Sequence, residues 1–160
     1  MMTVDNHGEI LARGNMIMDG YWQQPDQTDA AIRDGYFHTG DGGTIDDDNY
    51  VIITDRKKDV IVSGGENVSS LEVEDAIFQH PEVTEVAVIG IPDEKWGELV
   101  TALVVKVQGS ELNEADVIAF ARTRLAPYKC PKRVEFRAEL ARTATGKLQK
   151  FKLREPFWRS

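Results

Sequence analysis

The chain has 160 residues and a formal charge of −8, and this excess of acidic side chains argues against a nucleic-acid backbone as its partner. Its 41% hydrophobic and 29% charged residues are typical of a soluble globular protein, and no apolar run approaches the roughly 20 residues that span a bilayer. The first residues also lack the pattern of a secretory signal, so we expect a cytoplasmic protein without a membrane span.

Cysteine and histidine usage limits the metal sites and disulfides that are open to the chain. Cys130 is the single cysteine, which excludes an intramolecular disulfide and is expected to serve packing. His7, His38 and His80 are too widely spaced for a zinc motif. We therefore predict no metal site.

The first third of the chain is rich in Gly and Asp. Short apolar stretches such as 9–12 alternate with turn signals such as Asp41-Gly42-Gly43, which predicts short strands and loops. From Asp59 the pattern changes to strands and helices of ordinary length. We therefore predict a β-rich segment over 1–57 and a second domain over 58–160.

A helix and a pair of strands are predicted at the start of the second domain. Ser69, followed three residues later by Glu72, forms a capping box, and the apolar spacing after it predicts a helix that ends before Pro81. The β-branched stretches 83–91 and 99–107 are expected to pair as antiparallel strands.

A second helix and a last strand follow. Asn113 can cap the helix, with Leu112 and Val117 as a hydrophobic staple, and Pro127 ends it. A strand at 133–136 completes the domain. The predicted fold class is α+β, an antiparallel or mixed sheet flanked by helices in two or three layers.

The first motif of chemical interest is Gly35-Tyr36-Phe37-His38-Thr39-Gly40-Asp41. A carboxylate held in a glycine-containing turn can accept hydrogen bonds from both hydroxyls of a ribose. Alternatively, Asp41 bonds its own backbone in an Asx turn, and this segment alone favours that interpretation.

The second motif places five charged residues, 55–59, directly before an apolar strand. Arg56 offers a planar donor fork for phosphate or ribose oxygens, and Gly64 and Gly65 permit close approach of the backbone. The alternative is a polar linker followed by a glycine turn, which is equally plausible for Lys57 and Asp59.

The third motif, Thr143-Ala144-Thr145-Gly146-Lys147, is similar to half of a phosphate-binding loop. The full pattern fails, because Ala141 replaces the first glycine and Leu148 replaces the Ser or Thr that holds magnesium. Lys147 can still neutralise charge on a phosphoryl group. Taken alone, however, this motif is better explained by a lysine that is simply exposed to solvent. The basic residues from 147 to 159 could likewise meet an anion or be solvated surface.

Taken together, these segments resemble the last third of the adenylate-forming acyl-CoA synthetases, a family that includes luciferases and the adenylation domains of peptide synthetases. The resemblance covers roughly residues 8 to 154, and its segments stand in the same order. They are 20–22 with Pro25, 36–41, 55–74, 127–131 and 143–147.

The resemblance implies a reaction in two halves. A carboxylate attacks the α-phosphate of ATP, accompanied by Mg²⁺, to give an acyl-adenylate and pyrophosphate, and coenzyme A then displaces AMP. In this family the position of Asp41 binds the ribose hydroxyls, that of Arg56 contacts ribose or phosphate, and that of Lys147 contacts the carboxylate and the α-phosphate during adenylation.

The resemblance also implies a mobile domain. The position of Lys58 is the hinge, and Ser63, Gly64 and Gly65 line the pantetheine tunnel during thioester formation. Residues 1–57 then correspond to the end of the large N-terminal AMP-binding domain, whose missing body holds the adenine and acyl pockets. We expect the chain to be inactive alone.

The identity of the acid stays open. The segments 20–22 and 147–151 are most similar to medium- or long-chain fatty acid ligases. A peptide-synthetase or aryl-CoA branch is the alternative within the enzymes, and a non-catalytic module that binds nucleotide or a partner is the alternative outside them.

Overall fold

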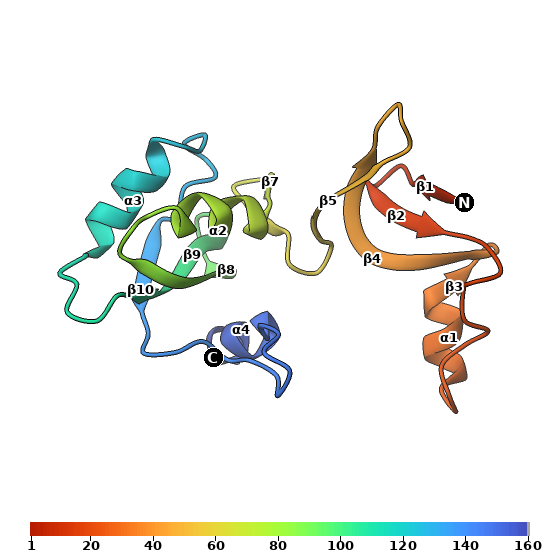
Figure 1. Cartoon of the computed structure of the whole chain (residues 1–160). Helices are drawn as coiled ribbons and strands as arrows, with labels where there is room; N and C mark the ends of the chain where they lie inside the picture. Colours follow the sequence, from red (N-terminus) through yellow and green to blue (C-terminus); the bar gives the residue numbers. More distant parts are fainter. Residues whose placement is uncertain (160) are drawn as a thin grey trace. The chain divides into compact units, whose positions relative to one another are not determined.

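The computed structural model describes residues 1–159, which form two compact units with the division between Lys58 and Asp59. Each unit is built around its own five-stranded sheet (Figure 1). No helix among the described residues is long and apolar enough to cross a membrane.

The first unit is an antiparallel sheet in the order β1-β2-β4-β3, with β5 paired to β4, and one short helix, α1. Its elements are β1 (Met2–Val4), β2 (Glu9–Ala12), α1 (Pro25–Ala31), β3 (Ile32–Arg33), β4 (Tyr36–Ile45) and β5 (Val51–Arg56). The expectation of short strands and loops missed α1, whose sequence signal is Pro25 in the first turn.

Two glycines shape the long strand β4, which curves through the first unit (Figure 1). The register with β5 shifts between Gly42 and Gly43, as at a β-bulge. A Cβ atom on Gly43 would lie 2.4 Å from the carbonyl oxygen of Ile52 and 2.7 Å from the Ile10 side chain. Glycine is therefore required where β4 passes this close to its neighbours.

The second unit has a mixed sheet in the order β10-β9-β6-β7, in which β8 also pairs with β9. The β8 and β6 strands run antiparallel to β9, and β10 runs parallel to it. The elements are β6 (Ile61–Ser63), β7 (Glu66–Val68), α2 (Ser70–Phe78), β8 (Val83–Asp93), β9 (Gly97–Lys106), α3 (Glu114–Arg122), β10 (Arg133–Phe136) and α4 (Lys150–Trp158).

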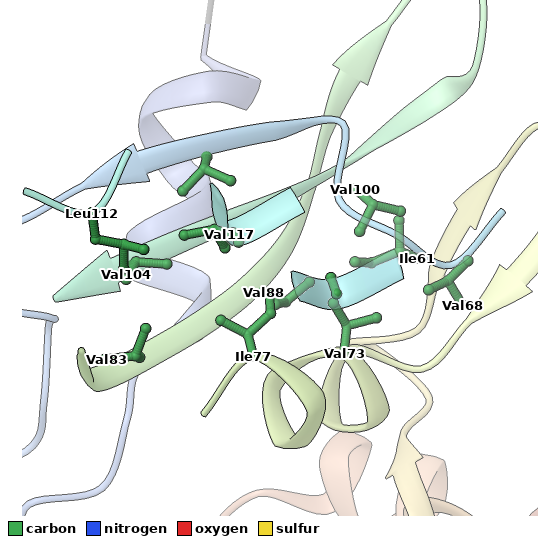
Figure 2. Packing of buried hydrophobic residues seen from close by; sticks show 13 residues of the cluster. Ile61, Val68, Val73, Ile77, Val83, Val88, Val100, Val104, Leu112 and Val117 are labelled. Atoms are coloured by element: carbon green, nitrogen blue, oxygen red, sulfur yellow. The ribbon is translucent and has the colours of Figure 1, made fainter. Parts of the chain in front are cut away.

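Alternating side chains divide the core of this unit between the two faces of the sheet. Val88 points into a cluster that includes Val73 and Ile77 of α2 and Val117 of α3 (Figure 2). Its neighbours along β8 belong to a second cluster, against which Leu153 and Phe157 of α4 pack. The sheet is therefore covered by helices on both faces, which confirms the α+β class.

The capping signals explain where α2 and α3 begin. Ser69 Oγ accepts the N–H of Glu72 at 3.3 Å, and Asn113 forms a full capping box with Asp116. The antiparallel strands and the strand at 133–136 are also observed as predicted. The helix α4 was not predicted, because Pro156 lies inside it and no side chain caps its first turn.

Candidate functional site

Asp41 and Arg56 face each other across β4 and β5. They are partners in the strand register, and Arg56 Nε lies 3.2 Å from Asp41 Oδ1. The Asp41 N–H donates a hydrogen bond to Thr39 Oγ1 at 3.1 Å, which helps to fix the backbone at Asp41. The Asp41 carboxylate is partly exposed and pairs with Arg56, an arrangement that differs from the Asx turn considered above.

Glu9 lies beneath this turn and was not anticipated from the sequence. Its buried carboxylate accepts the N–H of Gly40 at 3.0 Å and the ammonium of Lys57 at 3.1 Å, and His38 Nδ1 lies 3.2 Å away. Burial raises the pKa of Glu9, but the contact with the His38 ring and the hydrogen bonds from Lys57 and Gly40 outweigh it and hold the pKa below its usual value.

The Ser63-Gly64-Gly65 segment forms the tight turn between β6 and β7. Both glycines have positive φ, 62° and 85°, as the two central residues of a type I′ hairpin turn require. The N–H of Gly64 donates to the carbonyl of Trp96 at 2.8 Å, and a Cβ there would lie 2.9 Å from the Trp96 ring. The hydroxyl of Ser63 is buried and has no hydrogen-bond partner among residues 1–159.

Lys147 lies on an exposed loop, as expected, and its side chain is exposed to solvent. Hydrogen bonds within the loop fix its shape: Thr143 N–H donates to the Lys147 carbonyl at 2.8 Å, and Lys147 N–H donates to Thr143 Oγ1 at 3.0 Å. Gly146 closes the turn with a φ of 84°. Arg142, which precedes the loop, pairs with Glu85 of β8.

The turn at 63–65 and the Lys147 loop are attached to opposite ends of the β8–β9 hairpin. Ser63 pairs with Gly97, which is also the register partner of Asp93 at the end of β8. The Lys147 loop is joined to Glu85, near the start of β8. At about 3.3 Å per residue, Glu85 and Asp93 are separated by roughly 25 Å. The second unit thus carries the two candidate segments at opposite ends of one hairpin.

The basic C-terminal segment is largely engaged within the protein. Lys150 Nζ lies 2.7 Å from Glu74 Oε1 and 2.6 Å from Ser70 Oγ, and the same Glu74 oxygen accepts the N–H of Val88 at 2.7 Å. Arg154 pairs with Asp59 at 3.2 Å. These two basic residues therefore hold α4 against the domain, and the hypothesis of an anion site there is not needed to explain them.

Lys58, the expected hinge, is the last residue of the first unit and is exposed. Its neighbour Asp59 is buried and begins the second unit. Among residues 1–159, no group of three or more His, Cys, Asp or Glu side chains is arranged to hold a metal ion.

Residues 72–147 match the family described as AMP-binding enzyme C-terminal domain. The chain is 47% identical to a long-chain-fatty-acid–CoA ligase of Bacillus subtilis, over 93% of this chain and 27% of that protein. It is equally 47% identical to a feruloyl-CoA synthase of Amycolatopsis, over 94% of this chain and 30% of that protein.

A solved structure is similar as well. ATP-bound MatB from Rhodopseudomonas palustris matches with a TM-score of 0.88 and 43% identity, over 94% of this chain and 30% of MatB. The chain thus spans less than a third of the length of these relatives.

Proposed function

We propose, given that this chain carries the C-terminal domain of the adenylate-forming AMP-binding enzymes, that it works as the C-terminal part of an ATP-dependent acyl-CoA synthetase. The reaction would join a carboxylate to ATP with release of pyrophosphate, and then transfer the acyl group from AMP to the thiol of coenzyme A. The observation that carries the proposal is the 47% identity to named CoA ligases over more than nine tenths of this chain.

Adenylate formation would use three side chains of this chain. Asp41 would accept hydrogen bonds from the ribose hydroxyls of ATP, and Arg56, its partner across the strands, would hold the carboxylate in place and reach ribose or phosphate. Lys147, whose exposed side chain has no hydrogen bond or ion pair within residues 1–159, would stabilise the negative charge at the α-phosphate. One well-placed donor of this kind contributes about 3 kcal/mol.

Thioester formation would use the other end of the second unit. The turn at Ser63, Gly64 and Gly65 presents backbone without side-chain bulk, which suits a narrow passage for pantetheine. A rotation about Lys58 would bring this turn to the reaction centre in place of Lys147. The distance between the two segments along the hairpin supports this division of labour, because neither could serve both steps from one position.

The described residues contribute least to the binding of magnesium and of the acyl group. Among the described residues, no group of three or more His, Cys, Asp or Glu side chains could hold a metal ion. Mg²⁺ would therefore be held by the phosphates of ATP and by the rest of the enzyme. A fatty acid is the proposed substrate, in agreement with the name of the B. subtilis relative, a long-chain-fatty-acid–CoA ligase. The equally similar feruloyl-CoA synthase favours an aromatic acid as the second candidate.

The test is ATP–pyrophosphate exchange with a panel of fatty and aromatic acids. Three proteins are compared: this chain alone, the natural full-length product that contains it, and a chimera in which it replaces the matching segment of the B. subtilis ligase. We expect exchange in the two longer proteins and none in the chain alone. A folded chimera without exchange, beside an active parent ligase, would contradict the proposal.

A further inference from the structure

We propose that Glu85 and Arg142 are positioning residues that aim Lys147 at the phosphate during adenylate formation. The inference deepens the proposed function and rests on it. Its basis is a single guanidinium that joins a strand of the sheet to the loop that carries the lysine.

The contacts of Arg142 divide between these two places. Its Nε lies 3.1 Å and its Nη2 2.5 Å from the same carboxylate oxygen, Glu85 Oε2. Its Nη1 donates to the carbonyl of Gly146 at 2.8 Å, and Gly146 is the residue directly before Lys147. Because the guanidinium is planar and rigid, fixing one edge on Glu85 fixes the direction of the other edge toward Gly146.

Glu85 is a firm anchor because β8 pairs with β9 continuously from Glu85, which opposes Val105, to Asp93, after a register shift between Val83 and Glu85. The loop's own hydrogen bonds set its internal shape but do not connect it to the sheet. After the loop, Leu148 packs against the second core cluster, an apolar contact without directional preference. Before Lys147, the ion pair therefore supplies a directional attachment of the loop to β8, and the next directional attachment along the chain is Lys150, which pairs with Glu74 of α2.

Stability alone does not account for this arrangement. The side chains of Arg142 and Glu85 are 43% and 34% exposed, and ion pairs at this exposure contribute little to the free energy of unfolding. Geometry matters far more for Lys147, since a misplacement of about 1 Å in a catalytic group can cost roughly 100-fold in rate. The pair is thus expected to affect one reaction step rather than folding.

The experiment measures the two half-reactions separately in the natural full-length product. Pyrophosphate exchange reports adenylate formation, and release of AMP from a supplied acyl-adenylate and coenzyme A reports thioester formation. We expect Arg142→Ala and Glu85→Ala each to lower exchange by about 10- to 100-fold and to leave thioester formation within about twofold. The double variant should lose no more than the worse single variant, because the two residues act as one unit.

Two further variants make the result interpretable. Arg142→Lys keeps the charge but cannot bridge both partners, so exchange should stay well below wild type. Arg137→Ala removes a comparable surface pair, with Glu135 on β10, and should change neither half-reaction. Unchanged melting temperatures would establish that all variants are folded.

The outcomes separate this inference from the proposed function. Equal loss of both half-reactions in Arg142→Ala would show a merely structural role and overturn the inference. If Lys147→Ala abolishes exchange while Arg142→Ala and Glu85→Ala retain it, only the positioning role fails. If Lys147→Ala also retains exchange, the role of Lys147 in the proposed function fails, and the inference fails with it.

Discussion

Glu9 carries a negative charge into the interior of the first unit, which costs free energy unless donors surround the carboxylate. Gly40, Lys57 and His38 provide these contacts, and two of them lie in segments that frame Asp41. Glu9 therefore connects the turn before Asp41, the proposed ribose-binding residue, to Lys57, which precedes the expected hinge Lys58. Glu9 gave no signal in the sequence, because a glutamate at the start of a short apolar stretch is usually solvated.

The lowered pKa of Glu9 predicts a pH-dependent loss of stability in Glu9→Gln. The carboxylate stabilises the folded state at pH values above the pKa of the unfolded chain, and this contribution disappears as the pH falls through the lower pKa of the folded state. At pH 7 we expect a loss of about 1 to 3 kcal/mol, measured by urea denaturation followed by circular dichroism. At pH 3.5 the difference from wild type should shrink.

Asp47→Asn serves as the matched control for Glu9, since Asp47 lies exposed in the turn between β4 and β5. Its substitution should change stability by less than about 0.5 kcal/mol at either pH. An equal destabilisation of Glu9→Gln at both pH values would contradict the role assigned to the carboxylate charge.

At the scale of elements, α4 shows what local patterns cannot reveal. The sequence predicts α2 and α3 because Ser69 and Asn113 provide capping side chains and the apolar residues behind them recur at helical spacing. By contrast, α4 depends on long-range partners: Lys150 and Arg154 pair with carboxylates 76 and 95 positions earlier in the chain. No window of a few residues contains that information.

The buried pair of Lys150 and Glu74 predicts how firmly α4 is attached. Both side chains are only 11% exposed, so Lys150→Met takes an ammonium away from the buried Glu74 carboxylate and should destabilise the second unit by about 3 to 5 kcal/mol. Thermal and urea unfolding measure the loss. The double variant Lys150→Met with Glu74→Gln should recover part of it, because the buried negative charge is then removed together with the ammonium.

Lys152 provides the comparison on the same helix. It is exposed and lies over the Phe151 ring, so Lys152→Met should cost less than about 1 kcal/mol. Losses of similar size for Lys150→Met and Lys152→Met would mean that the buried pair does not anchor α4.

At the scale of the whole molecule, the change of sequence pattern near Lys58 lies beside the division between the two units. The pattern alone does not say how each unit is stabilised. The second unit has its own clusters on both faces of its sheet. The roles of Asp41, Arg56 and Lys147 could be proposed only through the resemblance to a family, because each fits an ordinary surface residue by itself. No sequence pattern links Arg142 to Glu85, since 57 positions separate them.

The division predicts that the second unit folds alone. Trypsin cleaves after lysine, and the exposed Lys57 and Lys58 precede the buried Asp59. Brief digestion should therefore release a fragment that begins at Asp59 and keeps a cooperative thermal transition, because its core needs no residue from the first unit. Mass spectrometry and circular dichroism test this. A fragment that unfolds or is degraded at once would show that the units depend on each other.

The β8–β9 hairpin, with a candidate segment at each end, has a consequence for how such a protein could diversify. Substitutions around Gly64 and Trp96 lie at the Asp93 end of β8, eight strand residues from Glu85, where the Lys147 loop is attached. Under the proposed division of labour, a lineage could therefore change which nucleophile receives the acyl group while it keeps the residues proposed to activate the acid. Because β8 and β9 are paired between the two ends, substitutions at the 63–65 turn can accumulate without moving the Lys147 loop.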